Sequence, residues 1–447
     1  MGLHCSIILA IFGAVFLSNA TASNEPLAIS SLAELAKAAA QSGQKVKMEP
    51  GVYRLVDFIP PTSVPERRER KEWQFLSFSG SDNVFDLRGV TLELDTVLRA
   101  LLRAPIHTDE FRVSGRNVTI EGLTITSVGN GKALGGAVLG LAGPGATLRD
   151  CTIHVQGSAP YGYGDLFGKG GYKHSGVHIT GSGARILGCK VFTKAFGHGF
   201  YLQEDCNDVL FEDCHVEGVM RRTDEILAET SGLAFDRKFR TELVNRSGAA
   251  RILPGYMKAL SEDAFRTYGT HRGVVLRHCT AKHMRGGFEL RTQSAPSIEY
   301  CTAVGCERAF WVSTGAVVTE CSGDAQFGPL LYVEGDRAKV DVRLLPAESG
   351  EATVHAIAAI YGTGNDVSII AATARAHPQP ILVGYCPPPA GENMVAHSER
   401  PVRDLNLRNS TTMPVVIGAK ASQCRVITRG PVEENHGKDI VVTPLAP

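Results

Sequence analysis

Five short segments of this chain place chemically active side chains at a nearly constant spacing. In each segment a small or polar residue is followed by a small residue, an apolar residue and a variable residue. The five segments are Ser175–Ile179, His198–Leu202, Asp263–Thr267, Gly286–Leu290 and Arg308–Val312. The variable residues are His178, Tyr201, Arg266, Glu289 and Trp311. Because side chains alternate between the two faces of a strand, we expect these five residues on one face and Val177, Phe200, Phe265, Phe288 and Phe310 on the other.

This mixture of acid, base, guanidinium and aromatic groups suits β-elimination of a uronic-acid polysaccharide. That reaction needs a base for the proton next to the carboxylate, a cation that neutralises the carboxylate, and an acid for the leaving oxygen. We assign Arg266 to the carboxylate, and His178 or His198 together with Tyr201 to the proton transfers. The expected substrate-binding residues are Lys173, His174, Gln203, Arg222, Asp263, Tyr268, Glu289, Arg291 and Trp311.

Three alternatives remain open. A glycoside hydrolase needs two carboxylates beside the scissile bond, and Asp263 and Glu289, one repeat apart, meet that requirement. The presence of Glu289 in the row is also explained by an ion pair that orients Arg266. A uronate epimerase needs the same proton abstraction. A non-catalytic carbohydrate-binding protein would present aromatic and amide side chains without an acid–base pair.

The spacing itself predicts the fold. Residues 178 and 201, and residues 266 and 289, are each 23 apart, and a cysteine follows each variable residue: Cys189, Cys214, Cys279, Cys301 and Cys321. Repeats of this length built from short strands are typical of a parallel β-solenoid. The cysteines are expected to be reduced and buried in its core; outside this column, Cys386 and Cys424 are the favoured pair if a disulfide forms.

Two insertions interrupt the repeat, at about 157–173 and 219–262. Both fall between a cysteine-bearing strand and the next variable strand, so both should leave the same corner of the solenoid and build its binding face. Leu139 is the expected counterpart of His178 one coil earlier.

The ends of the chain predict an exported single-domain protein. Residues 1–22 have the apolar run and small-x-small ending of a signal peptide, and residues 23–447 are expected to form one β-helix domain, begun by a capping helix over residues 30–42. The absence of any other apolar stretch of spanning length predicts a secreted or periplasmic monomer with no membrane span. The 46 basic and 46 acidic residues balance, which argues against a nucleic-acid partner and leaves an acidic polysaccharide as the expected one.

No cofactor or metal is expected. The sequence has no C-x-x-C pair or His/Cys ligand cluster for zinc. The acidic turn at 204–208 with Glu212 and Asp213 is the alternative, as a Ca²⁺ site, but a solvated turn between strands is the favoured explanation.

The chain resembles the pectate-lyase-like superfamily of right-handed parallel β-helix proteins over its mature length. The resemblance is carried by the capping helix with Pro50-Gly-Val-Tyr53 and by strand–turn–strand units that end in hydrophobe-x-x-Cys. The segments Lys173–Gly176 and Gly197–Gly199 are similar to those of secreted bacterial carbohydrate-active β-helix proteins. The resemblance implies an all-β fold. Because the superfamily includes polysaccharide lyases, epimerases, hydrolases and adhesins, the resemblance alone does not choose among these activities. Together with the acid, base and guanidinium groups of the variable row, it favours a secreted polysaccharide lyase.

Overall fold

The computed structural model describes residues 25–158, 172–231, 255–291, 295–347, 356–372, 379–386 and 398–446. The expected signal peptide at 1–22 and most of both insertions lie outside these ranges.

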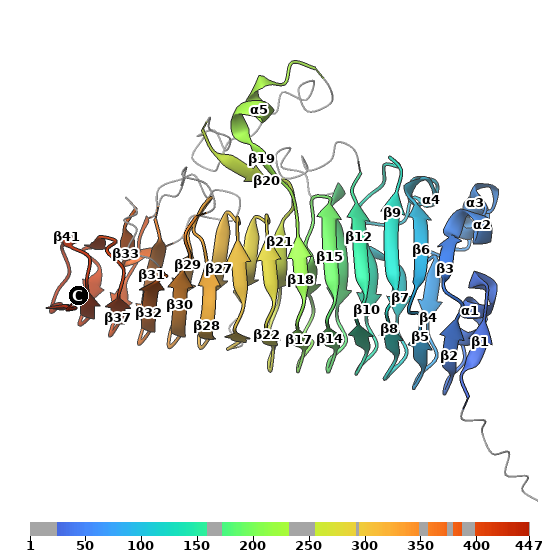
Figure 1. Cartoon of the computed structure of the whole chain (residues 1–447), viewed down its shortest axis with the longest axis horizontal. Coiled ribbons are helices and arrows are strands. Elements are labelled where there is room, and N and C mark those ends of the chain that lie inside the picture. Colours follow the sequence, from blue (N-terminus) through green and yellow to red (C-terminus); the bar gives the residue numbers. More distant parts are fainter. Residues whose placement is uncertain are drawn as a thin grey trace, which may run out of the picture.

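The protein is a right-handed parallel β-helix, with its strands side by side along one axis and the chain running from one end to the other (Figure 1). Each regular coil contributes one strand to a 15-stranded sheet and then two strands to a 23-stranded sheet. The 15-stranded sheet consists of β4 (Leu76–Phe78), β7 (Thr108–Val113), β10 (Gly136–Leu141), β13 (His174–Ile179), β16 (Phe200–Leu202), β21 (Asp263–Thr267), β24 (Gly286–Leu290), β27 (Arg308–Val312), β29 (Leu331–Glu334), β31 (Ala358–Thr363), β33 (Ile381–Val383), β36 (Val402–Arg403), β38 (Val415–Ile417), β39 (Ala421–Ser422) and β41 (Val432–Asn435).

The 23-stranded sheet forms the other faces of the solenoid. Its strands are β1 (Leu27–Ile29), β2 (Lys45–Met48), β3 (Gly51–Arg54), β5 (Val84–Asp86), β6 (Val90–Asp95), β8 (Thr119–Glu121), β9 (Thr124–Val128), β11 (Thr147–Arg149), β12 (Thr152–Gln156), β14 (Arg185–Leu187), β15 (Lys190–Lys194), β17 (Leu210–Glu212), β18 (His215–Glu217), β22 (Val275–Arg277), β23 (Thr280–Lys282), β25 (Ser297–Glu299), β26 (Thr302–Val304), β28 (Val317–Gly323), β30 (Lys339–Leu344), β32 (Asp366–Ala371), β37 (Asn406–Asn409), β40 (Arg425–Thr428) and β42 (Val441–Pro444).

Helices and two small antiparallel pairs complete the described structure. The pairs are β19 (Met220–Arg222) with β20 (Met257–Ala259), and β34 (Tyr385–Cys386) with β35 (Ser398–Glu399). The helices are α1 (Leu32–Ala39), α2 (Leu55–Phe58), the 3₁₀ turn η1 (Pro61–Ser63), α3 (Val64–Glu69), α4 (Thr96–Leu102) and α5 (Thr223–Ala228). None of the helices within the described ranges is long and apolar enough to cross a membrane.

The first helix begins where the sequence predicts. The Ser31 hydroxyl accepts a hydrogen bond from the backbone N–H of Glu34, and the Glu34 carboxylate accepts one from the backbone N–H of Ser30 at 2.9 Å. This capping box fixes α1, whose buried Leu35, Ala38 and Ala39 belong to the apolar core.

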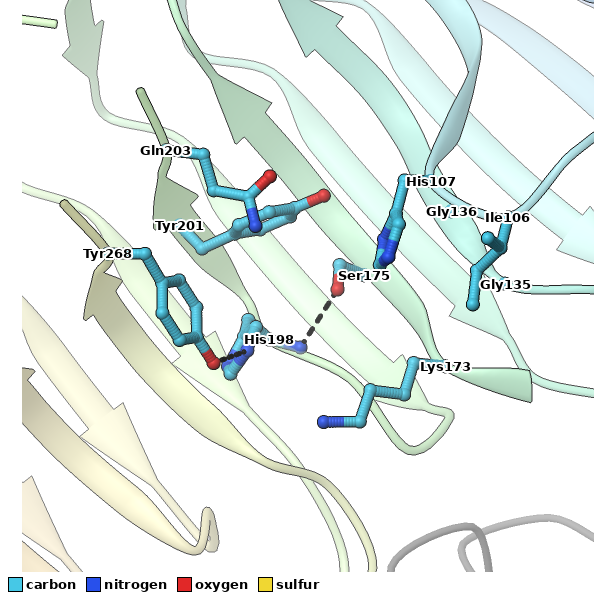
Figure 2. Close-up of a pocket in the computed structure, with 10 residues that line it drawn as sticks. All are labelled: Ile106, His107, Gly135, Gly136, Lys173, Ser175, His198, Tyr201, Gln203 and Tyr268. Carbon is cyan, nitrogen blue, oxygen red and sulfur yellow. Dashed lines mark hydrogen bonds between the residues drawn. The ribbon is translucent and has the colours of Figure 1, made fainter. Parts of the chain in front are cut away.

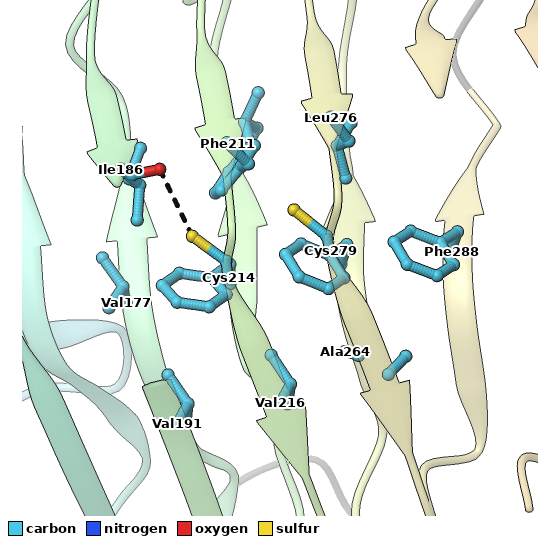
Figure 3. Packing of buried hydrophobic residues seen from close by; sticks show 14 of the residues in the cluster. Val177, Ile186, Val191, Phe211, Cys214, Val216, Ala264, Leu276, Cys279 and Phe288 are labelled. Atoms are coloured by element: carbon cyan, nitrogen blue, oxygen red, sulfur yellow. Dashed lines mark hydrogen bonds between the residues drawn. The ribbon is translucent and has the colours of Figure 1, made fainter. Parts of the chain in front are cut away.

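Stacked side chains fill the interior (Figure 3). Phe265 lies 5.0 Å from Phe288 between ring centroids, and Phe288 lies 5.1 Å from Phe310, with interplanar angles of 2° and 7°. The parallel register places equivalent residues of successive coils directly beside one another, so the apolar column of the sequence becomes a continuous ladder.

The cysteine column has a second role besides packing. No disulfide joins any two of the described cysteines, and the residue before each ladder cysteine has φ between 51° and 63°, which bends the chain between two strands. Each of these thiols then donates to the carbonyl oxygen two residues earlier, as Cys279 does to Arg277 at 3.2 Å. A small side chain with a weak donor therefore suits both the core and the bend. The favoured pairing is wrong, because no disulfide joins Cys386 to Cys424.

Both insertions leave the same corner, as predicted. The first follows β12 and ends at β13, and the second follows β18 and ends at β21, so each connects the 23-stranded sheet to the 15-stranded sheet. Helix α5 and the β19–β20 pair, part of the second insertion, project beyond the coils at this corner (Figure 1).

Candidate active site

The five variable residues lie in one row, as the spacing predicts. The Cα pairings run from Gly140 to His178, Tyr201, Arg266, Glu289 and Trp311 on successive strands of the 15-stranded sheet. The counterpart of His178 one coil earlier is Gly140, so the expectation for Leu139 is wrong: Leu139 pairs with Val177 and is buried in the core.

The row is not an open surface. Tyr201 is 6% exposed and Glu289 is 1% exposed, although both point away from the solenoid interior. A pocket of about 90 Å³ opens beside Tyr201, bounded by residues that precede these strands, such as Lys173, and by residues that follow them, such as Tyr268. We call it the His198 pocket; it is lined by Ile106, His107, Gly135, Gly136, Lys173, Ser175, His198, Tyr201, Gln203 and Tyr268 (Figure 2).

His198 lies at the centre of a polar chain. Its Nε2 atom is 2.9 Å from the Tyr268 hydroxyl, and its Nδ1 atom is 3.4 Å from Oδ2 of Asp263. Oε2 of Glu262 lies 3.4 Å from the same Nε2. Two carboxylates therefore flank an imidazole that faces a phenol, and the backbone N–H of Asp263 donates to its Nδ1 atom at 3.4 Å.

Tyr268 and Tyr201 are held in the phenol form. Burial raises the pKa of both hydroxyls well above the ordinary value for tyrosine, and the carboxylates nearby, among them Glu262, raise it further. For Tyr268, the Arg266 guanidinium, 4.6 Å from its ring centroid, opposes part of that shift. At neutral pH both tyrosines are proton donors.

Lys173 supplies the cation of the pocket. Its Nζ atom is 2.6 Å from Oε1 of Glu262, and Nη2 of Arg285 contacts the same oxygen at 3.1 Å. Burial alone would raise the pKa of Glu262, but the charges of His198, Arg285 and Lys173 lower it. Figure 2 shows Tyr268 and Lys173 on either side of His198.

A buried charge network continues beside the pocket. Glu289 pairs with Arg266, with Arg308 at 3.1 Å and with Arg291 at 3.3 Å, while Arg285 holds both oxygens of Asp263 at 3.2 and 3.3 Å. Burial opposes ionisation of Asp263, yet Arg285 and His198 hold its pKa well below the ordinary value. The network also includes the Lys173–Glu262 pair and Glu334, which accepts a hydrogen bond from Arg291 at 2.9 Å. The described residues of the network are therefore five cations and four carboxylates, and its net charge is one positive charge when His198 is neutral.

A bend in the strands creates this network. Ala264 and Phe265 both pack in the core, and so do Ala309 and Phe310, so strict alternation fails just before each phenylalanine. Asp263 and Arg308 consequently reach the outer face. Gly286 between them leaves the space, since a Cβ there would lie 2.6 Å from Oδ1 of Asp263 and 2.9 Å from Oε2 of Glu289.

His178 is held beneath the pocket by a residue two coils away. Oδ1 of Asp109 lies 3.0 Å from Nδ1 of His178, and Nη1 of Arg112 lies 2.7 Å from the other carboxylate oxygen. The Asp109 side chain crosses over Gly140, where a Cβ would lie 2.0 Å from Oδ2. The imidazole of His178 stacks on the Tyr201 ring at 4.6 Å and 9°, so His178 supports Tyr201 from below.

The predicted site residues fall into three groups. Lys173, His198, Tyr201, Gln203 and Tyr268 meet in the pocket. Asp263, Arg266, Glu289, Arg291 and Trp311 lie in or against the charge network, where the Arg291 guanidinium covers the Trp311 ring at 3.9 Å. His174 and Arg222 lie elsewhere: His174 is 2% exposed with Nε2 2.7 Å from the Ser158 hydroxyl, and Arg222 is at the end of β19, 3.8 Å from Asp224.

Several pocket residues were not predicted. Ser175 accepts a hydrogen bond from the backbone N–H of His198 at 3.1 Å. Ile106, His107 and Gly135 come from the turns before β7 and β10, and Gly136 begins β10. Only Ser175 had a sequence signal, because it begins the first repeat segment. The turns before β7 and β10 carry no variable residue that would have marked them.

Within the described ranges, no group of three or more His, Cys, Asp or Glu side chains is arranged to hold a metal ion.

Comparisons with known proteins identify the fold. No family model matches the chain, and no curated protein matches its sequence. A PL6 alginate lyase solved in complex with a trisaccharide matches at a TM-score of 0.51 and 12% identity, covering 95% of this chain and 86% of that one. The chain has the fold of this alginate lyase.

Two further solved structures are similar at lower scores. A mannuronic acid specific family 6 lyase from the human gut microbiota has a TM-score of 0.49 and 8% identity, with 94% of this chain and 82% of that one covered. A PL6 polysaccharide lyase from Pseudopedobacter saltans has a TM-score of 0.42 and 11% identity, with 93% and 92% covered.

Proposed function

We propose that this protein is an exported polysaccharide lyase that cleaves a uronic-acid polysaccharide by β-elimination in the His198 pocket. The observation that carries the proposal is the 2.9 Å contact between Nε2 of His198 and the Tyr268 hydroxyl, beside the Lys173 amine. The alginate lyase with the same fold supports alginate as the first substrate to test. The leader-like segment at 1–22 supports export.

The proton transfers balance within this pair. His198 Nε2 removes the proton on the carbon next to the carboxylate, and the Asp263 and Glu262 carboxylates stabilise the resulting imidazolium. Negative charge that develops on the substrate carboxylate is stabilised by the Lys173 ammonium. As the C4–O bond breaks, Tyr268 donates its proton to the leaving oxygen; the imidazolium then returns a proton to the tyrosinate across the 2.9 Å contact, which restores both groups.

Base and acid lie on one side of the sugar in this scheme. That geometry suits a uronate whose C5 hydrogen and C4 oxygen are on the same ring face, as in β-linked mannuronate. The excess positive charge of the network favours a polyanion in the pocket. Tyr201 and Gln203 serve as additional donors to the sugar, and Arg266, which lies over Tyr268, positions that ring.

Hydrolysis by Asp263 and Glu289 fits this geometry poorly. Asp263 is 0% exposed and Glu289 is 1% exposed, and both are held by arginines. A hydrolase also needs one protonated carboxyl group, whereas the pKa of Asp263 lies well below its ordinary value.

The test is incubation of the purified full chain with polymannuronate, polyguluronate and polygalacturonate, with absorbance near 230 nm reporting the new C4–C5 double bond. Each assay is run with added Ca²⁺ and with a chelator, which tests the expectation that no cofactor is required. New reducing ends without ultraviolet absorbance would replace the lyase with a hydrolase, and C5 inversion without cleavage would replace it with an epimerase.

A further inference from the structure

A second and larger pocket lies on the opposite side of the insertion corner. Its volume is about 470 Å³, and it is formed on the 23-stranded sheet where β9, β12, β15 and β18 end. The residues that carry the argument are Thr126, His154, Gln156, Phe192, Lys194 and Glu217. We call it the His154 pocket.

The rings in this pocket offer a flat surface. Thr126, His154, Phe192 and Glu217 pair in register on four successive coils. His154 and Phe192 stack at 5.1 Å between centroids with an interplanar angle of 13°. The residue paired with His154 on its other side is the small Thr126, which also lines the pocket, so a second ring does not stack on that side of the imidazole. Burial and the nearby Lys194 lower the pKa of His154, which keeps the ring neutral at neutral pH, as stacking on the C–H face of a sugar requires.

The charge of the pocket favours an anion. Lys282 neutralises Glu217 within the protein at 3.3 Å, and Nε2 of His215 contacts the same carboxylate at 3.3 Å. Lys194 is exposed, and no ion pair joins it to another described side chain, so its charge is available to a ligand. Gln156 and Thr126 add polar groups to the lining.

The two pockets share one turn of the chain. Lys194 ends β15 on the 23-stranded sheet, and His198, four residues later, lines the other pocket just before β16. Residues 195–199 form the corner between them.

We propose that the His154 pocket is a second carbohydrate-binding site that holds an anionic stretch of the polysaccharide, with one sugar ring against His154 and a carboxylate on Lys194. The identity of the ligand as a uronate chain rests on the proposed function. The site binds without taking part in the chemistry.

The test is affinity electrophoresis of the full chain in native gels that contain alginate, because retardation reports binding whether or not turnover occurs. We expect His154→Ala and Lys194→Ala each to weaken retardation several-fold, and the double variant about tenfold. His154→Gln, which keeps polarity but removes the flat ring, should resemble His154→Ala. Matched controls are Lys190→Ala, an exposed lysine of the same strand, and His278→Ala, which stacks on Tyr300 at 5.1 Å elsewhere; both should retain wild-type retardation.

The outcomes separate the two proposals. Normal retardation of the double variant overturns the second site, whatever the lyase activity. Equal retardation of the wild type by a neutral galactomannan overturns the anionic ligand class. Binding to alginate that depends on His154 and Lys194, without any unsaturated product, supports the second site and overturns the lyase.

Discussion

The Tyr268 hydroxyl lies 2.9 Å from Nε2 of His198, although the two residues are 70 positions apart in the sequence. The second insertion accounts for most of that separation. Because the insertion leaves the coil at the corner, β16 and β21 remain hydrogen-bonded neighbours, with Tyr201 paired to Arg266. The insertion therefore lengthens the chain between acid and base without moving them apart.

Tyr268→Phe should abolish most turnover and leave folding intact. The change removes only the hydroxyl that reprotonates the leaving oxygen, so kcat should fall by about 10²–10⁴-fold, the contribution of a general acid. Initial rates on polymannuronate measure the effect, and circular dichroism checks the fold. Tyr201→Phe is the matched control in the same pocket and should lose less; the reverse order would make Tyr201 the acid.

Lys173→Gln should lower kcat by about 10²–10³-fold, because the developing carboxylate charge loses its cation. Glutamine keeps a hydrogen-bond donor near Glu262, and Arg285 still contacts that carboxylate at 3.1 Å, which limits structural damage. Lys190→Gln, on the exposed face of β15, serves as the control. A variant that raises KM alone would show that Lys173 contributes binding and not transition-state stabilisation.

The sequence was sufficient for the fold and for the row of variable residues, because a period of two within strands and a coil of 22–23 residues between them are both regular. It failed where that regularity ends. Arg308, and Asp263, which was predicted as a site residue, reach the outer face only because the strands bend before Phe310 and Phe265; strict alternation would point both side chains into the core. The expectation for Leu139 missed its neighbour Gly140, which pairs with His178 and whose missing Cβ lets Asp109 reach His178.

Stability should fall on mild acidification because of His174. Burial, helped by Arg99, holds the pKa of His174 well below its ordinary value, so the folded protein keeps it neutral while the unfolded chain protonates it near pH 6.5. Protons then favour the unfolded state, and each pH unit below about 6.5 should cost about 1.4 kcal/mol of unfolding free energy relative to His174→Gln. Urea titrations of both proteins between pH 7 and 5 measure the difference, and parallel curves would contradict it.

The ladder thiols should not react until the protein unfolds. The ladder cysteines are all buried, so a thiol reagent reaches them only when the coils open. A chromogenic disulfide reagent should find at most the half-buried Cys386 in the native protein, and the ladder cysteines should react together in denaturant. Rapid labelling of Cys301 in native buffer would show that the coils open locally.

Phe288→Ala should destabilise the β-helix strongly. Phe288 is fully buried between Phe265 and Phe310, which stack on its two faces at 5.0 and 5.1 Å, so its removal leaves a cavity that neighbouring coils are too tightly hydrogen-bonded to close. Truncation of a buried phenylalanine typically costs about 3–5 kcal/mol. Val52→Ala, at a side chain that is 65% exposed on the first coils, is the control and should change the urea midpoint little. If both variants have the urea midpoint of the wild type, the phenylalanine ladder does not limit the stability of the solenoid. Unfolding in urea would then begin in coils that do not contain the ladder.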